Sequence, residues 1–154
     1  MKITDFLGED LIETGVETSD KSGLCETIVD FLISKNKIRK ERRQILLDKL
    51  IERESLSSTG IGGGVAIPHA SGENIDDMIV AIVQIPKGVD YSAIDNEPVR
   101  LAFVIIGSER VPRVHLQLLA TIVRACKNKE LIEAMQEAGS SEDIYSLMLD
   151  FDRK

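Results

Sequence analysis

The sequence predicts an α/β fold in which a small mixed β-sheet of about five strands is sandwiched between helices. Amphipathic helical patterns occupy both ends of the 154-residue chain, whereas its middle holds short runs of Ile, Val and Phe bounded by Gly and Pro. Hydrophobic residues make up 43% of the chain, which is enough to bury a sizeable core. We therefore expect a single domain over residues 1–154.

The N-terminal part of the chain predicts a short helical turn, a brief strand and then two helices. Apolar residues are scattered over 1–18, where the turn and the strand are expected. Ser19 and Asp20 can cap a first helix, and residues 38–54 form the second helical pattern. Small polar residues over 55–60 then indicate a loop. The helix positions expected to be buried are Leu24, Ile28, Phe31 and Leu32, followed by Leu46, Leu47, Leu50 and Ile51.

The rest of the chain predicts strands first and helices afterwards. Residues 99–106 are apolar on both faces, so this strand is expected at the centre of the sheet. Gly139 ends one helix and Ser140 caps the next, with Asp143 as its capping-box partner. The other strands are expected over 65–67 and 78–85, and the helices over 114–126, over 129–138 and from Ser140 onward. The buried face of helix 114–126 is expected to hold Leu116, Leu119, Ala120 and Val123.

Charge and composition exclude several classes of function. A formal net charge of -7 argues against a nucleic-acid-binding protein, because nucleic acids attract basic surfaces. No run approaches the roughly 20 apolar residues of a membrane span, and no signal-like segment opens the chain, so we expect a cytoplasmic protein without membrane insertion. Cys25 and Cys126 form no CxxC motif and are expected to be reduced thiols rather than a disulfide or a zinc site.

The stretch GIGGGVAIPHASG, residues 60–72, combines a glycine-rich segment with one of the two histidines of the chain. It is not a P-loop, since Val65 and Ala66 stand where Lys and Ser or Thr would follow the last glycine. It also fails the dinucleotide-binding fingerprint, because Val65 occupies the third glycine position and Pro68 prevents the helix that would follow. A flexible surface loop is an alternative explanation of the glycines.

His69 directly follows Pro68, so its ring is expected to project from a stiff support. A serine hydrolase that uses Ser71 would need a G-x-S-x-G elbow, which is missing, and a metal site of His69 and His115 would need carboxylates that the sequence does not place. Nucleophilic attack on a phosphoryl group needs a rigid imidazole, backbone amides and a cationic or second imidazole neighbour. Arg53 and His115 are candidates for these neighbours. The candidate phosphate cradle consists of the amides of Gly60, Gly62, Gly63 and Gly64.

Four segments of the chain together resemble a known family. They are Arg53-Glu54, Ser58-Thr59-Gly60-Ile61-Gly62, Gly64-Val65-Ala66-Ile67-Pro68-His69, and His115-Leu116 at the opening of a helix. In this combination the chain resembles the mannitol/fructose-type enzyme IIA domains of the bacterial phosphoenolpyruvate-dependent sugar phosphotransferase system (PTS), a group that includes the nitrogen-regulatory IIA proteins. The resemblance extends over essentially the whole chain, and STGIG followed by AIPH is a specific signature.

The resemblance implies roles for three residues. His69 matches the histidine that accepts a phosphoryl group from phospho-HPr, in family members normally on Nε2. His115 matches the second active-site histidine, which hydrogen-bonds the phosphoryl group, and Arg53 matches an arginine that supports the site electrostatically. The alternative for Arg53 is a surface ion pair with Glu52 or Glu54, and the alternative for His115 is an ordinary helix-terminal histidine.

The function implied by the resemblance is that of a phosphoryl carrier, which needs neither metal nor cofactor because the donor phosphoramidate is already activated. A nitrogen-regulatory IIA protein is the favoured interpretation, since the opening segment MKITDFLGEDLI resembles that branch. The alternative is the IIA subunit of a fructose- or mannitol-type transporter, which passes the group to a cysteine of a IIB domain. A third alternative is a IIA-like sensor that is never phosphorylated, which the intact pair of histidines disfavours.

Partner docking is expected around His69. An apolar patch of Ile61 and Val65 is expected to receive HPr. Many family members carry a proline soon after the strand that matches 99–106, whereas this chain continues with GSERVP, residues 107–112, which predicts a different connection to His115. The acidic residues expected to meet the basic rim of HPr are Glu73, Asp76 and Asp77.

Overall fold

The computed structural model describes residues 1–72, 75 and 77–154. The helices of this part of the chain are α1 (Lys21–Ser34), α2 (Arg43–Leu56), α3 (Pro112–Cys126), α4 (Lys129–Glu137) and α5 (Ser141–Asp152). The strands are β1 (Ile12–Glu13), β2 (Gly60–Gly62), β3 (Val65–Ala66), β4 (His69–Gly72), β5 (Ile79–Val89) and β6 (Val99–Ser108). Short 3-10 turns occur at Ile3–Asp5, Glu9–Leu11 and Lys40–Arg42.

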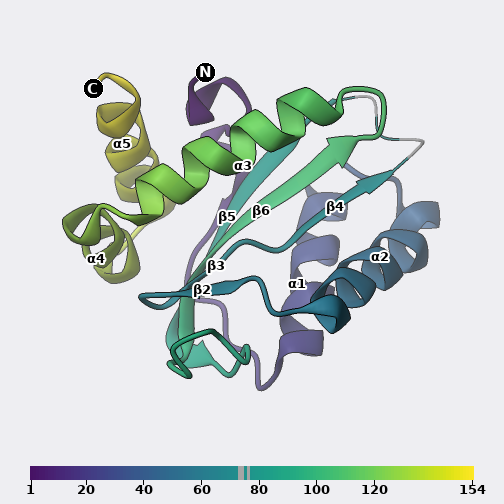
Figure 1. Cartoon of the computed structure of the whole chain (residues 1–154), viewed down its shortest axis with the longest axis horizontal. Helices are drawn as coiled ribbons and strands as arrows, with labels where there is room; N and C mark the ends of the chain where they lie inside the picture. The colour runs from purple at the N-terminus through teal and green to yellow at the C-terminus, as the bar shows by residue number, and fades with distance from the viewer. Residues whose placement is uncertain (73–74, 76) are drawn as a thin grey trace.

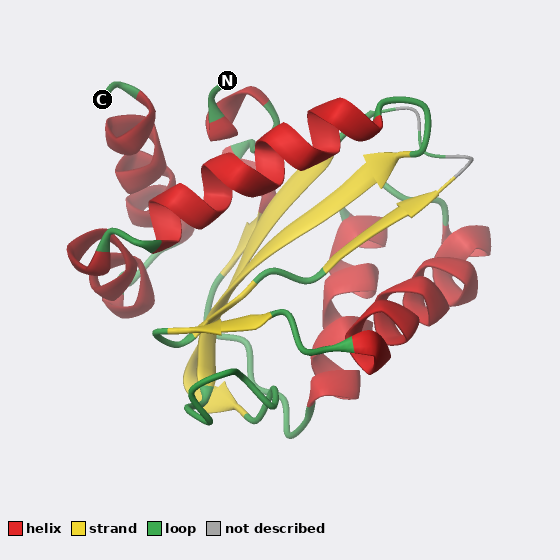
Figure 2. Ribbon diagram, viewed as in Figure 1, coloured by secondary structure: helices red, strands yellow, loops and turns green. Residues whose placement is uncertain are grey.

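The strands form one mixed sheet. β1, β5, β6, β3 and β2 follow one another across it, and β4 also pairs with β6. β5 and β6 are antiparallel, as are β2 and β3, whereas β1 pairs in parallel with β5, and β3 and β4 pair in parallel with β6. α3 crosses one face of the sheet, and α1 and α2 lie on the other side (Figure 1, Figure 2). The predicted α/β sandwich is therefore confirmed, with six strands among the described residues.

β6 lies at the centre of the sheet, as its two apolar faces predict. All of its residues except Arg100 are buried, and β5 lies on one side of it with β3 and β4 on the other. Ile67 and Pro68 separate β3 from β4, and Pro68 has no N–H to contribute to the ladder. The carbonyl of Pro68 still accepts from the backbone N–H of Ile105 at 3.0 Å. The segment from β3 to β4 therefore stays attached to β6 through the break.

The helices begin largely where the capping residues predict. The side chain of Asp20 accepts from the backbone N–H of Gly23, and that of Ser140 accepts from the backbone N–H of Asp143. α2 differs from the expected 38–54, because a 3-10 turn precedes it and the helix continues to Leu56. α3 begins earlier than expected, since a proline at the first helical position has no N–H to leave unpaired.

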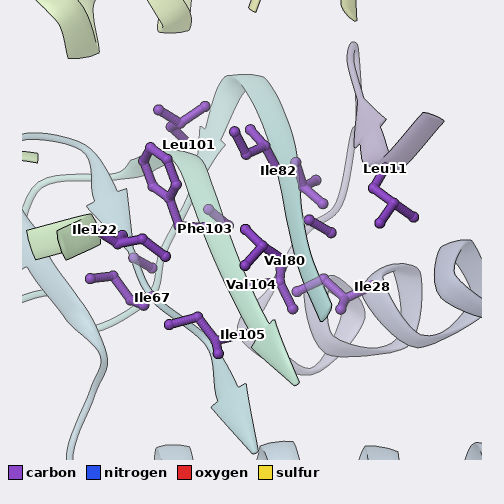
Figure 3. Close-up of a cluster of buried hydrophobic side chains, with 14 of the residues drawn as sticks. Leu11, Ile28, Ile67, Val80, Ile82, Leu101, Phe103, Val104, Ile105 and Ile122 are labelled. Carbon is purple, nitrogen blue, oxygen red and sulfur yellow. The ribbon is translucent and has the colours of Figure 1, made fainter. Parts of the chain in front are cut away.

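The core consists mainly of aliphatic side chains from the sheet and the helices that cover it. Figure 3 shows Ile28 of α1, Phe103 of β6 and Ile122 of α3 in this cluster. The burial predicted for the first helix is confirmed at all four positions. Both cysteines are free thiols as expected, with Cys25 buried and Cys126 half-buried.

The predicted buried faces of α2 and α3 need correction. Ile51 on α2 is 39% exposed and Leu116 on α3 is 67% exposed. Ala120 is also exposed, whereas Leu119 and Val123 are half-buried. The buried face of α3 is instead formed by Leu118, Ile122 and Ala125. The polar residues of α3 occupy one narrow side and apolar residues cover more than half of its circumference, so its periodicity alone does not determine which part of the apolar side meets the sheet.

Gln84 is a polar side chain of β5 that fastens α4 to the sheet. It is 3% exposed, and the two hydrogens of its Nε2 are shared among the carbonyl oxygens of Met135 at 3.0 Å, Gln136 at 3.3 Å and Ala138 at 2.8 Å. These carbonyls lie at the end of α4, where no following helical N–H can satisfy them. The amide of Gln84 takes the place of those missing donors.

We expect Gln84→Leu to lower the free energy of unfolding by about 1–3 kcal/mol, because buried carbonyls lose their donor. Urea denaturation followed by circular dichroism measures the change. Gln117→Leu, on the exposed side of α3, is the matched control and is expected to change the free energy by less than about 0.5 kcal/mol. Equal effects of the two substitutions would contradict this role of Gln84.

Candidate functional site

The candidate site lies where β4 begins, between the last turn of α2 and the first turns of α3 (Figure 1). His69 is the first residue of β4 and pairs with Ile105 of β6. Arg53 reaches its ring from α2, and His115 approaches it from α3. The structure thus brings together the three side chains to which the sequence assigns chemistry.

The ring of His69 is held in one tautomer by its two neighbours. Its Nδ1 lies 2.7 Å from the carbonyl oxygen of Ile67. Because a carbonyl can only accept, Nδ1 carries the proton and Nε2 carries the lone pair. The Nε of Arg53 donates to this Nε2 at 3.3 Å, which agrees with the same tautomer. The half-buried ring therefore presents Nε2 as its nucleophilic nitrogen.

Arg53 connects the end of α2 with the ring. Besides its contact with His69, its Nη1 donates to the carbonyl oxygen of Ser57 at 3.0 Å. Within the described part of the chain no carboxylate forms an ion pair with it, so the expected alternative of a salt bridge with Glu52 or Glu54 is not found. The guanidinium is a cation directed at the ring rather than at a neighbouring acid.

His115 lies against His69 from the N-terminal part of α3. The two ring centroids are 5.8 Å apart and the ring planes are inclined by 65°. Burial lowers the pKa of His115 below its ordinary value of 6.5, and the nearby His69 adds to this effect. The ring nitrogens of His115 have no hydrogen-bond partner among the described residues. His115 is thus an imidazole that favours the neutral form and has an N–H available for a ligand.

Gly107 allows this close approach and was not singled out by the sequence. A Cβ at this position would lie 2.5 Å from Nδ1 of His115 and 3.0 Å from the sulfur of Met78. The sequence offers one signal, a glycine at the end of a strand that is otherwise apolar, which often marks a close approach of another group. The GSERVP connection therefore brings His115 to the ring of His69, and Gly107 provides the space.

The glycine-rich segment serves a different purpose from the one expected. Gly62, Gly63 and Gly64 have φ angles of 97°, 68° and 77°, which suit glycine; Gly62 ends β2, and Gly63 and Gly64 form the turn to β3. The N–H of Gly63 donates to Asp95 at 3.0 Å, and the N–H of Gly60 donates to the hydroxyl of Ser58 at 3.0 Å.

This turn lies away from the ring of His69. The carbonyl of Gly64 accepts from the backbone N–H of Leu101, whereas His69 pairs with Ile105, four residues further along β6. Four residues of an extended strand span roughly 13 Å. The structure therefore does not bring Gly62, Gly63 and Gly64 to the ring as a phosphate cradle, and the amide of Gly60 already has a partner.

Apolar side chains are exposed around the site, but not all of the expected ones. Ile61 is 42% exposed, whereas Val65 is buried in β3 and cannot contribute to a docking patch. Leu56, one helical turn after Arg53, is 78% exposed. Of the three acidic residues expected to meet a partner, Asp77 is exposed. Glu73 and Asp76 lie outside the described residues.

Comparison with known families matches residues 5–150 to the family described as "Phosphoenolpyruvate-dependent sugar phosphotransferase system, EIIA 2". The chain belongs to this family. The match includes His69, His115 and Arg53 and confirms the resemblance that the sequence motifs indicated.

Individual relatives of this IIA chain come from both branches of the family. The fructose-specific PTS EIIABC component of Bacillus subtilis (strain 168) is 31% identical over 99% of this chain, which spans only 24% of that protein. The crystal structure of nitrogen regulatory protein IIA-Ntr from Neisseria meningitidis has a TM-score of 0.86 and 26% identity, and the match covers 95% of this chain and 98% of that one. The complex of enzyme IIAMTL and phosphorylated enzyme IIBMTL from Escherichia coli shows the same fold, with a TM-score of 0.76, 20% identity and coverage of 94% and 97%.

Among the residues that the structure describes, no third side chain joins the two histidines to form a metal site. In residues 1–72, 75 and 77–154, no group of three or more His, Cys, Asp or Glu side chains is arranged to hold a metal ion.

The helices of this IIA chain, over the same residues, include none that is long and apolar enough to cross a bilayer.

We expect Gly107→Ala to displace the ring of His115, because the new methyl group would overlap its Nδ1. The imidazole signals of His115 and His69 in NMR spectra should shift, while circular dichroism stays that of the folded protein. Gly139→Ala is the control, since a Cβ there has no heavy atom within 4 Å. Unchanged imidazole signals in Gly107→Ala would show that Gly107 does not set the position of the ring.

The lowered pKa of His115 predicts a pH dependence of stability. Between its pKa in the folded state and the ordinary value of 6.5, the unfolded chain binds more protons than the folded chain. The free energy of unfolding should therefore rise with pH through this window, and below the window the contribution of His115 should no longer change with pH. Urea denaturation at several values between about pH 5 and 7 measures this slope. His115→Gln should flatten it, and an equal slope in both proteins would contradict the assignment.

Proposed function

We propose that this chain is a phosphoryl carrier in which Nε2 of His69 accepts a phosphoryl group from the phosphohistidine of an HPr-type protein. Membership of the PTS IIA family implies a role in phosphotransfer. The observation that carries the proposal is the contact of Nδ1 with the carbonyl of Ile67, because it leaves the lone pair on Nε2. The protein would perform this role in the cytoplasm.

The proposed step exchanges one P–N bond for another. The lone pair of Nε2 attacks phosphorus in line, the bond to the donor histidine breaks, and its electron pair returns to the donor ring. Arg53 turns from Nε2 to the phosphoryl oxygens as the new bond forms, and the free N–H of His115 donates to another oxygen. Positioning and electrostatics supply most of the catalysis in such a transfer.

The exposed apolar side chains next to the site support docking of a protein donor. Leu56 follows Arg53 by one helical turn, and Leu116 directly follows His115 with 67% of its surface exposed. Exposed apolar groups around a polar centre are typical of protein interaction sites. We assign Leu56 and Leu116 to the surface that receives HPr.

The favoured role is that of a nitrogen-regulatory IIA protein. The close structural match to IIA-Ntr of Neisseria meningitidis supports it. Transport is the second candidate, supported by the 31% identity to the fructose-specific EIIABC component of Bacillus subtilis. In that case the acceptor would be a IIB domain, as in the Escherichia coli mannitol complex.

Intact mass spectrometry after incubation with phosphoenolpyruvate, enzyme I and HPr tests the carrier role. We expect the wild type to gain one acid-labile phosphoryl group, and His69→Gln to gain none because it lacks the nucleophile. A protein that gains no group, or a His69→Gln variant that still gains one, would overturn the proposal. Transfer from the phosphorylated wild type to a fructose-type IIB domain would then identify the transport role, and its failure would favour regulation.

A further inference from the structure

The final turn of α2 carries two adjacent charged residues that point in different directions. Arg53 contacts Nε2 of His69, whereas Glu54 is 6% exposed and points into the protein. Neighbouring positions on an α-helix are about 100° apart, which explains the difference. Glu54 is one of the few charged residues buried in the described part of the chain.

The carboxylate of Glu54 holds Thr59 by two hydrogen bonds. One oxygen accepts from the backbone N–H of Thr59 at 2.9 Å, and the other accepts from its hydroxyl at 2.5 Å. The Nζ of Lys21, at the start of α1, lies 3.6 Å from the same carboxylate. A buried charge is costly unless it is paired and hydrogen-bonded, and Glu54 meets both conditions.

Cys25 and Tyr91 also lie near Glu54, but neither compensates its negative charge. Burial and the charge of Glu54 raise the pKa of the Cys25 thiol to about 11. The same two causes raise the pKa of Tyr91, whose hydroxyl has no well-formed hydrogen bond among the described residues. Both groups therefore stay neutral, and Lys21 is the cation that compensates Glu54.

Thr59 is connected in turn to the ring of His69. Its carbonyl oxygen accepts from the backbone N–H of Ile67 at 3.0 Å. The carbonyl of Ile67 then accepts from Nδ1 of His69 at 2.7 Å. Two peptide segments thus link the carboxylate of Glu54 to the nitrogen whose proton sets the tautomer.

We propose that Glu54 is a positioning residue that, through Thr59 and Ile67, holds His69 in the tautomer with its proton on Nδ1. Arg53 contacts the ring at Nε2, so the two adjacent residues act on its two nitrogens. An effect of Glu54 on the rate of phosphoryl acceptance rests on the proposed function, whereas its effect on the tautomer of His69 does not. If Glu54 only stabilised the contact between α2 and the following turn, its substitution would lower the stability of the protein but leave the tautomer of His69 unchanged.

NMR of the ¹⁵N-labelled imidazole rings tests the proposal directly. At a pH where both histidines are neutral, the wild type should show His69 with a proton on Nδ1 and none on Nε2. Glu54→Gln leaves one acceptor oxygen where Thr59 uses two and removes the negative charge, and Thr59→Val loses the hydroxyl, so both should shift the His69 nitrogen signals toward a mixture of tautomers. Thr59→Ser should restore the wild-type signals, and Glu52→Gln, an exposed neighbour, should leave them unchanged.

The rate of phosphoryl acceptance from phospho-HPr supplies the second measurement. Glu54→Gln and Thr59→Val should slow it by about 10- to 100-fold, since small misplacements of a reacting group have effects of this size. A lower melting temperature with unchanged His69 signals and an unchanged rate would overturn the positioning role. If the two variants show shifted His69 signals but the wild type accepts no phosphoryl group, the proposed function is overturned and the positioning role stands. If Glu54→Gln does not fold, the comparison of Thr59→Val with Thr59→Ser decides the question.

Discussion

The arrangement of the site depends on the parallel pairing of residues 65–72 with β6, which Pro68 interrupts. Without an N–H, Pro68 cannot donate to the ladder, although its carbonyl still accepts from Ile105 and the register with β6 continues. In this break the carbonyl of Ile67 accepts from Nδ1 of His69. A continuous strand would direct side chains to alternate faces and leave the ring without this contact to its own backbone. The break in the strand is therefore what orients the ring.

Helices on the two sides of the sheet complete the environment of that ring. α2 supplies a cation, and α3 supplies an imidazole that favours the neutral form. The unphosphorylated site thus holds one permanent positive charge in a chain of net charge -7. A bound phosphoryl group would bring negative charge to half-buried groups, and such a change is large enough for a partner protein to recognise. The same local event would serve transport and regulation equally well.

The packing of α3 also connects the core with the docking surface. Leu118, Ile122 and Ala125 face the sheet, which leaves Leu116 exposed beside His115. Gly107 lets the helix bring His115 close to β6. The rotation of one helix about its axis therefore sets both the distance between the two rings and which apolar residue is exposed beside His115.

The sequence by itself determined the class of fold, the capping residues of α1 and α5 and the central strand, and it named the three side chains that the structure brings together. These features depend on neighbouring residues, on periodicity or on a family signature. Only the tertiary structure decided that the turn glycines lie away from His69, that Leu116 is exposed, and that Glu54 is buried beside Lys21. Those outcomes depend on strand register and on contacts between segments far apart in the chain. The physical reason is that burial and register are set by the packing of whole elements, which local patterns do not specify.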